Sequence, residues 1–133
     1  MKPKIDIVTL GVEDLEKSVR FYRYMLELDD EQVVAGEDHV AFFLDSEMSL
    51  VLFPRAEIAR IADQRTVAPS SAEIMLSHTA ANKEEVDEIL TQAECAGGTI
   101  LQQGSANEWG YAGSFLDLDG HIWEVSAAIG GTE

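Results

Sequence analysis

The sequence carries the same order of secondary-structure signals twice, and this repeat limits the folds open to the chain more than any other feature. In each copy an apolar, β-branched run is followed by an amphipathic helical stretch and then by three short runs bounded by turn residues. The expected strands are residues 5–12, 31–35, 39–44 and 48–53 in the first copy, and 72–78, 99–103, 113–116 and 121–127 in the second. Aligning 8–12 with 74–78 sets an offset of 66 between the copies.

Each copy is expected to form one βαβββ module, module 1 over about residues 4–65 and module 2 over about 72–128. A polar stretch that contains proline, residues 66–71, separates them as a linker. A single helix covers only one face of a sheet, so neither module is expected to close alone, and the two curved sheets are expected to pair about a pseudo-twofold axis. The sequence therefore predicts an α+β fold and a single domain spanning residues 1–133.

Both expected helices have recognisable ends. Asp14 is the expected N-cap of the first helix. Asn82 is the expected N-cap of the second, and Glu85, three residues on, is its capping-box partner. The second helix is expected to end at Gly97-Gly98.

Acidic residues far outnumber basic ones: 25 Asp and Glu against 9 Lys and Arg give a formal net charge of −16 at pH 7. Lys83 is the last basic residue. Nucleic acids and anionic membranes are bound mainly through Lys and Arg, so we expect neither as a partner. Two interpretations of the excess remain open: it attracts a cationic ligand, or it serves solubility alone.

Cys95 is the only cysteine, which excludes an internal disulfide and fits a reducing, cytoplasmic location. At the expected helix end, this small side chain is predicted to be buried. Asp6 interrupts the N-terminal apolar run, so no signal peptide is expected, and no run is long enough to span a membrane. Phosphate loops, zinc-protease motifs and nucleophile elbows are missing, so phosphoryl transfer and acyl-enzyme catalysis have no support.

Two segments near the ends of the chain resemble one family. Residues 8–22, VTLGVEDLEKSVRFY, and residues 109–125, WGYAGSFLDLDGHIWEV, are similar to the opening strand and helix and to the closing hairpin of the vicinal oxygen chelate superfamily. That superfamily includes glyoxalase I, bleomycin resistance proteins and extradiol dioxygenases. The resemblance implies the glyoxalase/bleomycin resistance fold, in which the two modules pair into a curved mixed β-sheet cup with the helices outside, usually in a homodimer, with a small-molecule ligand and a metal held inside the cup. The acidic charge and the aromatic residues suggest that this ligand is cationic or aromatic.

In metal-using members of that superfamily, four ligands come from the first and last strands of the two modules. The resemblance places these positions at Ile7, at Leu50 or Leu52, at Glu73 and at Glu124. Leu50 and Leu52 share one strand face, so a shift of two residues supplies no donor. Two carboxylates fall short of the roughly three or four donors of a closed Zn²⁺ or Ni²⁺ site. We therefore expect no metal and no cofactor, with a divalent metal as the alternative.

The histidines are expected to contribute little to a metal site. Strand alternation points His78 and His121 away from the cup. His39, near a turn in module 1, either points inward from the mouth of a strand or is a solvated turn residue.

Glu73 and Glu124 each interrupt an apolar strand. A carboxylate in such a position is costly unless it is solvated, paired or protonated. If both face the cup, they form either a general base or a cation site. The alternatives place Glu73 at a wet strand end and leave Glu124 as a hydrogen-bonded structural residue.

Trp109 and Tyr111 flank Gly110 after an expected loop, residues 104–108. Their rings either offer flat apolar area to a planar or cationic ligand or pack against the domain or a dimer partner. Thr9, Met75 and His39 complete the ligand-binding set that we expect alongside Glu73, Trp109 and Tyr111.

Two functions follow. The first is a glyoxalase/bleomycin-resistance-like protein that binds a small molecule in the cup without a complete metal site. The second is a glyoxalase-type, metal-dependent isomerase or lyase with Glu124 as base or ligand.

Overall fold

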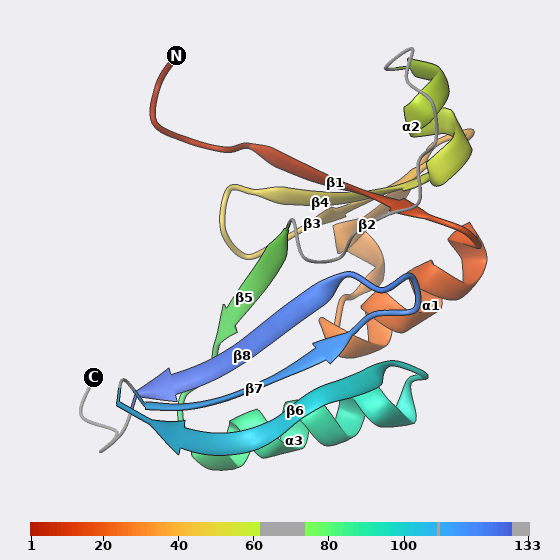
Figure 1. The fold of residues 1–133 in the computed structure, drawn as a ribbon. Helices are drawn as coiled ribbons and strands as arrows, with labels where there is room; N and C mark the ends of the chain where they lie inside the picture. Colours follow the sequence, from red (N-terminus) through yellow and green to blue (C-terminus); the bar gives the residue numbers. More distant parts are fainter. Residues whose placement is uncertain (62–73, 109, 129–133) are drawn as a thin grey trace. The chain divides into compact units, whose positions relative to one another are not determined.

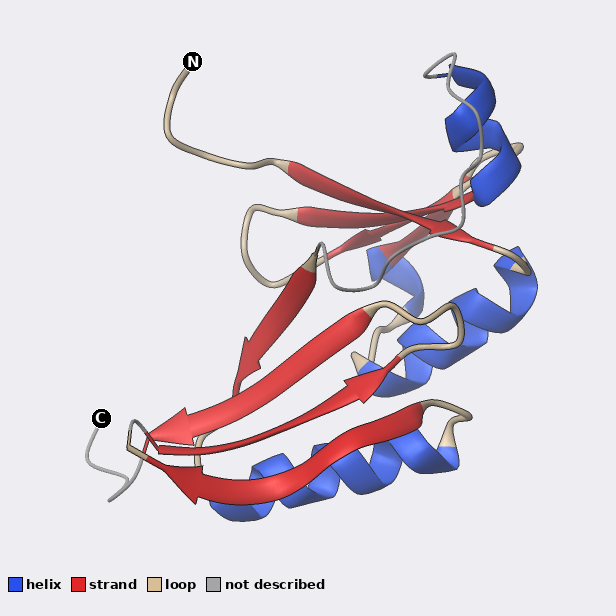
Figure 2. Cartoon of the chain, in the orientation of Figure 1, coloured by secondary structure: helices blue, strands red, loops and turns tan. Residues whose placement is uncertain are grey.

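The structure, a computed structural model, describes residues 1–61, 74–108 and 110–128. The chain divides into two compact units, Met1–Ala68 (unit 1) and Pro69–Glu133 (unit 2), and each contains a four-stranded mixed sheet with helices (Figure 1, Figure 2). The predicted α+β class and the two βαβββ modules are confirmed. The pairing of the two sheets into a cup stays a prediction, and the expected linker lies outside the described residues.

Unit 1 has its strands in the order β1-β4-β3-β2, with β1 parallel to β4 and the other pairs antiparallel. On one face the α1 residues Phe21 and Tyr22 are buried, and the Tyr22 ring lies 6.3 Å from that of Phe42. Leu10 and Leu52 complete this core. The elements are β1 (Ile7–Val12), α1 (Leu15–Met25), a 3₁₀ helix η1 (Asp30–Gln32), β2 (Val33–Ala35), β3 (Val40–Phe43), β4 (Ser49–Pro54) and α2 (Arg55–Ile61).

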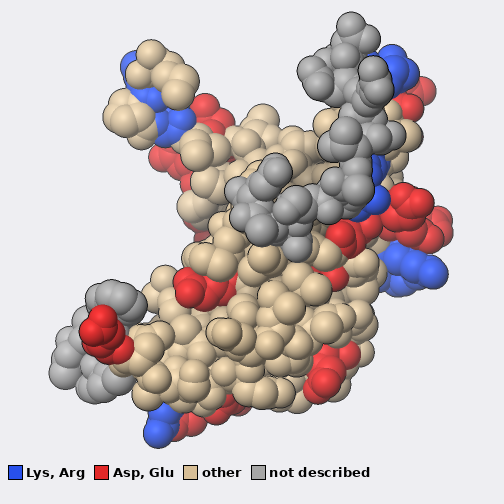
Figure 3. Space-filling view, viewed as in Figure 1, with Lys and Arg blue, Asp and Glu red and all other residues tan. Residues whose placement is uncertain are grey.

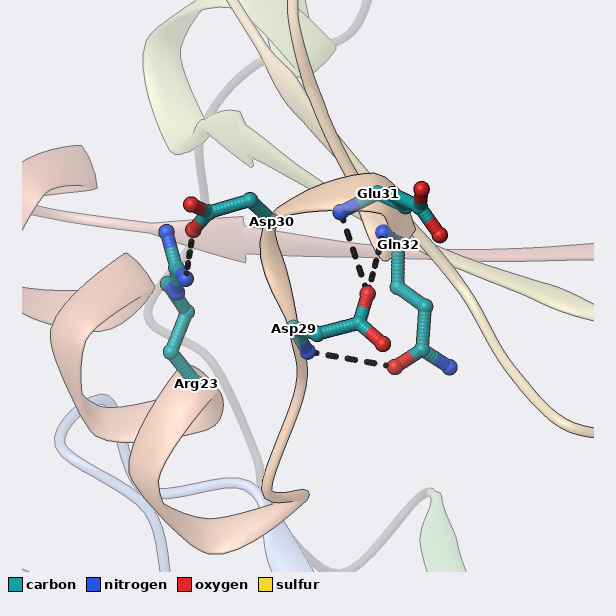
Figure 4. A network of polar contacts seen from close by, with 5 residues as sticks. All are labelled: Arg23, Asp29, Asp30, Glu31 and Gln32. Carbon is teal, nitrogen blue, oxygen red and sulfur yellow. Dashed lines mark hydrogen bonds and ion pairs between the residues drawn. The ribbon is translucent and has the colours of Figure 1, made fainter.

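The predicted strand 31–35 is wrong in its first half, because a capping box forms η1 there (Figure 4). One Asp29 side-chain oxygen accepts the backbone N–H groups of Glu31 and Gln32, and the Gln32 side-chain oxygen accepts the N–H of Asp29. Asp30 pairs with Arg23 of α1. An aspartate that satisfies nearby N–H groups competes with strand pairing, which explains the short β2.

Unit 2 has its strands in the order β5-β8-β7-β6, with β5 parallel to β8. Helix α3 packs along one face through Val86, Leu90 and Ala93, which are buried together with Phe115 and Val125 of the sheet. The elements are β5 (Met75–Thr79), α3 (Lys83–Cys95), β6 (Thr99–Asn107), β7 (Gly110–Leu116) and β8 (Ile122–Ala128).

The predicted helix caps are confirmed. Asp14 accepts the N–H of Lys17, and Asn82 accepts the N–H of Glu85. The Glu85 carboxylate reaches one residue further back than a standard capping box and accepts the N–H of Ala81. At the other end of α3, Gly97 N–H donates to Glu94 O and Gly98 N–H to Ala93 O, the pairing of a Schellman motif.

Two local predictions are wrong. Residues 104–107 of the expected loop belong to β6, which accommodates them through two register shifts along β7. Cys95 is exposed, because the buried stripe of α3 runs through Val86, Leu90 and Ala93 and leaves position 95 on the solvent side. Within the described ranges, no helix is both long and apolar enough to cross a membrane.

Candidate functional site

The two faces of the unit 2 sheet differ in what covers them. On β7 and β8 the side chains of Phe115, Val125 and Ala127 are buried on the face that packs against α3. Because strand side chains alternate, the intervening residues lie on the opposite face, which we call the open face. It carries, strand by strand, Met75, Ser77 and Thr79 of β5, Ile122, Glu124 and Ser126 of β8, Ala112, Ser114 and Leu116 of β7, and Gln102 of β6.

Four polar residues cross the open face side by side. Ser77 pairs with Glu124, Glu124 with Ser114, and Ser114 with Gln102 in the strand register. We call these four residues the polar row. The Ser77 hydroxyl donates to Glu124 Oε1 at 3.4 Å, and Glu124 is half-buried. Among the ion pairs of the described residues, none includes Glu124.

The neighbouring row is apolar. Met75 pairs with Ile122 and Ile122 with Leu116, so these three side chains lie side by side, and we call them the apolar row. Met75 is 54% exposed. Figure 3 shows that the surface over β7 and β8 is formed mostly by residues other than Lys, Arg, Asp and Glu. The open face therefore combines one carboxylate with hydroxyls and an apolar strip.

The start of β8 is fixed by Asp117, whose side chain is 1% exposed. Its Oδ1 accepts the N–H groups of Asp119 and His121, and its Oδ2 lies 2.7 Å from His121 Nδ1. This turn fixes the register from which Glu124, three residues after His121, reaches the open face. His78 lies on the other face from Glu124, as alternation predicts, whereas His121 belongs to the turn before β8 and its Nδ1 lies beside Asp117.

Tyr111 lies on the α3 face of the sheet, so the structure separates it from Glu124. Its hydroxyl donates to Asp87 Oδ1 of α3 at 2.8 Å, and this bond is the main cause that raises the pKa of Tyr111 above its ordinary value. Of the expected ligand-binding residues that the structure describes, Met75 is the one that lies on the open face with Glu124. Glu73 and Trp109 lie outside the described residues.

In unit 1, Thr9 and His39 lie on the face opposite α1. Thr9 is exposed and pairs with Val51. The His39 ring stacks on Phe53, with centroids 5.0 Å apart, and its Nδ1 lies 2.9 Å from Asp38 Oδ1. The bond from His39 lowers the pKa of the Asp38 carboxyl below its ordinary value.

Comparison with known families agrees with this architecture. The model of the Glyoxalase/Bleomycin resistance protein/Dioxygenase superfamily matches residues 4–125. The chain belongs to this superfamily. The resemblance drawn from residues 8–22 and 109–125 is thereby confirmed.

Solved structures of several similar proteins have the same fold. A glyoxalase-related enzyme from Fulvimarina pelagi is 26% identical, with a TM-score of 0.81 over 95% of this chain and 88% of that one. A hypothetical protein from S. aureus is 25% identical, with a TM-score of 0.80 over 96% and 95%. Lactoylglutathione lyase from Agrobacterium tumefaciens, 23% identical, has a TM-score of 0.68 over 96% and 95%, a likeness of fold alone. No curated protein sequence matches the chain.

The strand register corrects the metal positions carried over from the superfamily. The pair Thr9 and Val51 corresponds to the pair Met75 and Ile122, so the unit 1 position equivalent to Glu124 is Phe53. Leu50 and Leu52 instead lie buried on the α1 side.

The donor set does not fit a metal centre at the positions that the structure describes. Ile7, Leu50, Leu52 and Phe53 have no donor atoms in their side chains, which leaves Glu124 alone. Across the described residues, no three His, Cys, Asp or Glu side chains gather closely enough to hold an ion.

The sequence interpretation missed Ser77, Ser114 and Gln102 as neighbours of Glu124. Each of these residues lies within an expected strand, so alternation along that strand already indicated which of its residues share a face. Their common row follows from the register between strands, which one sequence does not supply.

Proposed function

We propose that this superfamily member binds a small molecule on the open face of unit 2, with Glu124 as the anchoring group and without a complete metal site. The observation that carries the proposal is the half-buried Glu124 carboxylate beside Ser77, outside every ion pair of the described residues. A partly desolvated carboxylate gains stability from a ligand that supplies a hydrogen-bond donor or a positive charge.

The residues around Glu124 support access for a ligand. Serines flank it on both neighbouring strands, and their side chains are shorter than that of Glu124. The apolar row beside it provides the area over which a ligand body gains affinity.

Chemical-shift mapping tests the proposal. The ¹⁵N-labelled chain is titrated with a chemically varied panel of small molecules, and a binder is expected to shift the amides of Ser77, Ser114 and Glu124 more than those of α3. In a thermal-shift assay the same binder stabilises the fold by about 2.7 kcal/mol at a hundred times Kd. The proposal is wrong if no compound shifts the open face, or if all shifts map elsewhere.

A second candidate is a glyoxalase-type isomerase or lyase in which Glu124 takes a proton from carbon. It is favoured by the fold likeness to lactoylglutathione lyase and by the position of a carboxylate beside an apolar strip. Glu124→Gln discriminates between the candidates: an enzyme loses turnover by orders of magnitude, whereas a binding protein changes in affinity alone.

Metal analysis separates the candidates a second way. The chain is purified without chelator or metal-affinity tag, and its metal content is measured by mass spectrometry. Near-stoichiometric metal that disappears in Glu124→Gln would favour the metal-dependent enzyme, and metal-free protein would favour binding alone.

A further inference from the structure

We propose that the ligand of the open face is an amphipathic amine, with its ammonium group on Glu124 and an apolar group, one short linker away, on the apolar row. This inference rests on the proposed function and names the chemical class of its ligand.

The charge of the open face selects a cation. Among the described residues of the sheet, Glu124 is the one charged residue on the open face, and the hydrogen-bond partner of Glu124, Ser77, is neutral. Lys83 is the only Lys or Arg in residues 69–133, and it lies in the first turn of α3. The positive charge that complements Glu124 therefore does not come from unit 2 itself, and a bound ligand can supply it.

The polar row matches the hydrogen bonds of an ammonium group. An ammonium has three N–H donors and no acceptor. Glu124 offers carboxylate oxygens, and Ser77 and Ser114 on the flanking strands each offer a hydroxyl with two lone pairs. A divalent metal would need more anionic or imidazole donors than this row contains.

The apolar row indicates the chemistry of the rest of the ligand and its distance from the ammonium group. Ile122 precedes Glu124 by two residues on the same strand face, which separates them by about 6.8 Å. Met75 and Leu116 flank Ile122 on strands about 4.8 Å to each side, so the apolar row is about 9.6 Å long and is large enough to cover an aromatic ring. A ring joined to an amine by a two-carbon linker spans both rows.

Three matched probes test this class by calorimetry and amide shifts at low ionic strength: 2-phenylethylamine, the neutral 2-phenylethanol, and ethylamine, which lacks the ring. We expect 2-phenylethylamine to bind at least about tenfold more tightly than either, the effect of one charged hydrogen bond or one buried ring. Glu124→Gln should abolish the preference for the amine over the alcohol. Met75→Gln should weaken 2-phenylethylamine and leave ethylamine unchanged.

Glu94→Gln is the matched control, because it makes the same charge change at an exposed position of α3. It should keep the preference for the amine. An equal loss in Glu94→Gln and Glu124→Gln would show that bulk charge attracts the amine and would overturn the inference.

Other outcomes separate this inference from the proposed function. Equal binding of amine and alcohol, with shifts on the open face, would refute the amine class and leave the proposed function standing. Binding of Zn²⁺ or Ni²⁺ alone at Glu124, more tightly than the amine, would also overturn the class. If neither these probes nor the wider panel shift the open face, the proposed function itself fails. Should Glu124→Gln fail to fold, Ser77→Ala and Ser114→Ala test the same row, and each should weaken the amine more than the alcohol.

Discussion

Removing the Asp117 carboxylate should destabilise unit 2 more than any substitution on its surface. The side chain is buried and binds two backbone N–H groups and His121 Nδ1. Each hydrogen bond to a charged group contributes about 1.5 to 3 kcal/mol, and its loss leaves partly buried donors without a partner. We therefore expect Asp117→Ala to lower the free energy of unfolding by roughly 3 to 5 kcal/mol, allowing for bonds that water replaces.

Thermal and urea unfolding measure this loss. For a chain of this length, about 3 to 5 °C of melting temperature corresponds to 1 kcal/mol, so Asp117→Ala should melt about 10 to 20 °C lower. Asp45→Ala, at an exposed turn of unit 1, is the control and should stay within about 0.5 kcal/mol of the parent chain. A loss below about 1 kcal/mol in Asp117→Ala would refute the argument that this carboxylate holds the β7–β8 turn.

Three further predictions concern α3 and the strands it covers. In Gly104→Ala the new Cβ would lie 2.5 Å from Asp87 Oδ1 and from the Tyr111 ring. The variant should therefore lose the Tyr111–Asp87 bond and about 1 to 3 kcal/mol of unfolding free energy, measured by urea unfolding. Unchanged stability would contradict the close approach. Because the bond to Asp87 raises the pKa of Tyr111 in the folded protein, this bond stabilises the fold at pH values below the unfolded pKa of 10.0. The stabilisation is lost as the pH rises through the folded pKa. Asp87→Asn should therefore move the ultraviolet titration of Tyr111 to lower pH, with Tyr111→Phe identifying its signal. Asn82→Ala should cost about 1 kcal/mol through the lost N-cap, and Asn82→Asp should restore it.

Local chemistry made the helices predictable. A cap or a stop depends on a few consecutive residues, so Asp14, Asn82 and Gly97-Gly98 could be placed without knowing what packs against them. The same locality produced the error at residues 31–35, where β-branched residues favour a strand and Asp29 favours a capped turn. The glycine at position 104 suggested a loop, but it lies within β6, which needs a residue without Cβ beside Tyr111.

The site was only partly predictable, because it depends on register. Glu124 was found from its place in an apolar strand and from the family resemblance, whereas Ser77 and Ser114 became its neighbours only through pairing between strands. The metal-ligand position carried over from the superfamily to Leu52 is displaced by one residue from the position that the strand register gives. A slip of one residue moves a side chain to the other face of a sheet, so Leu52 lies in the α1 core while Phe53 takes the equivalent of Glu124.

The two modules provide a comparison within one chain. Their helix-covered faces have the same character, with buried apolar residues such as Leu52 in unit 1 and Val125 in unit 2. Their other faces differ, because Phe53 stands where unit 2 has Glu124. Continuing the β3–β4 register by one residue places His39 opposite Phe53, where unit 2 has Ser114, and the stacked rings agree with that pairing.

Packing against a helix explains why one face is similar in both modules. A buried position tolerates little besides an apolar side chain of suitable volume, so the helix faces of both units stay apolar. The opposite faces do not share one covering element. In unit 1, Arg55 and Ile58 of α2 lie against Gly11, the strand partner of Phe53, whereas Glu124 of unit 2 lies on the face away from α3. On these faces the two modules present different chemistry. A carboxylate in a strand is costly unless something compensates it, and the backbone repeat does not require one, since Phe53 occupies the same place in unit 1. The repeated fold alone therefore does not account for Glu124, which supports the proposal that this carboxylate anchors a ligand.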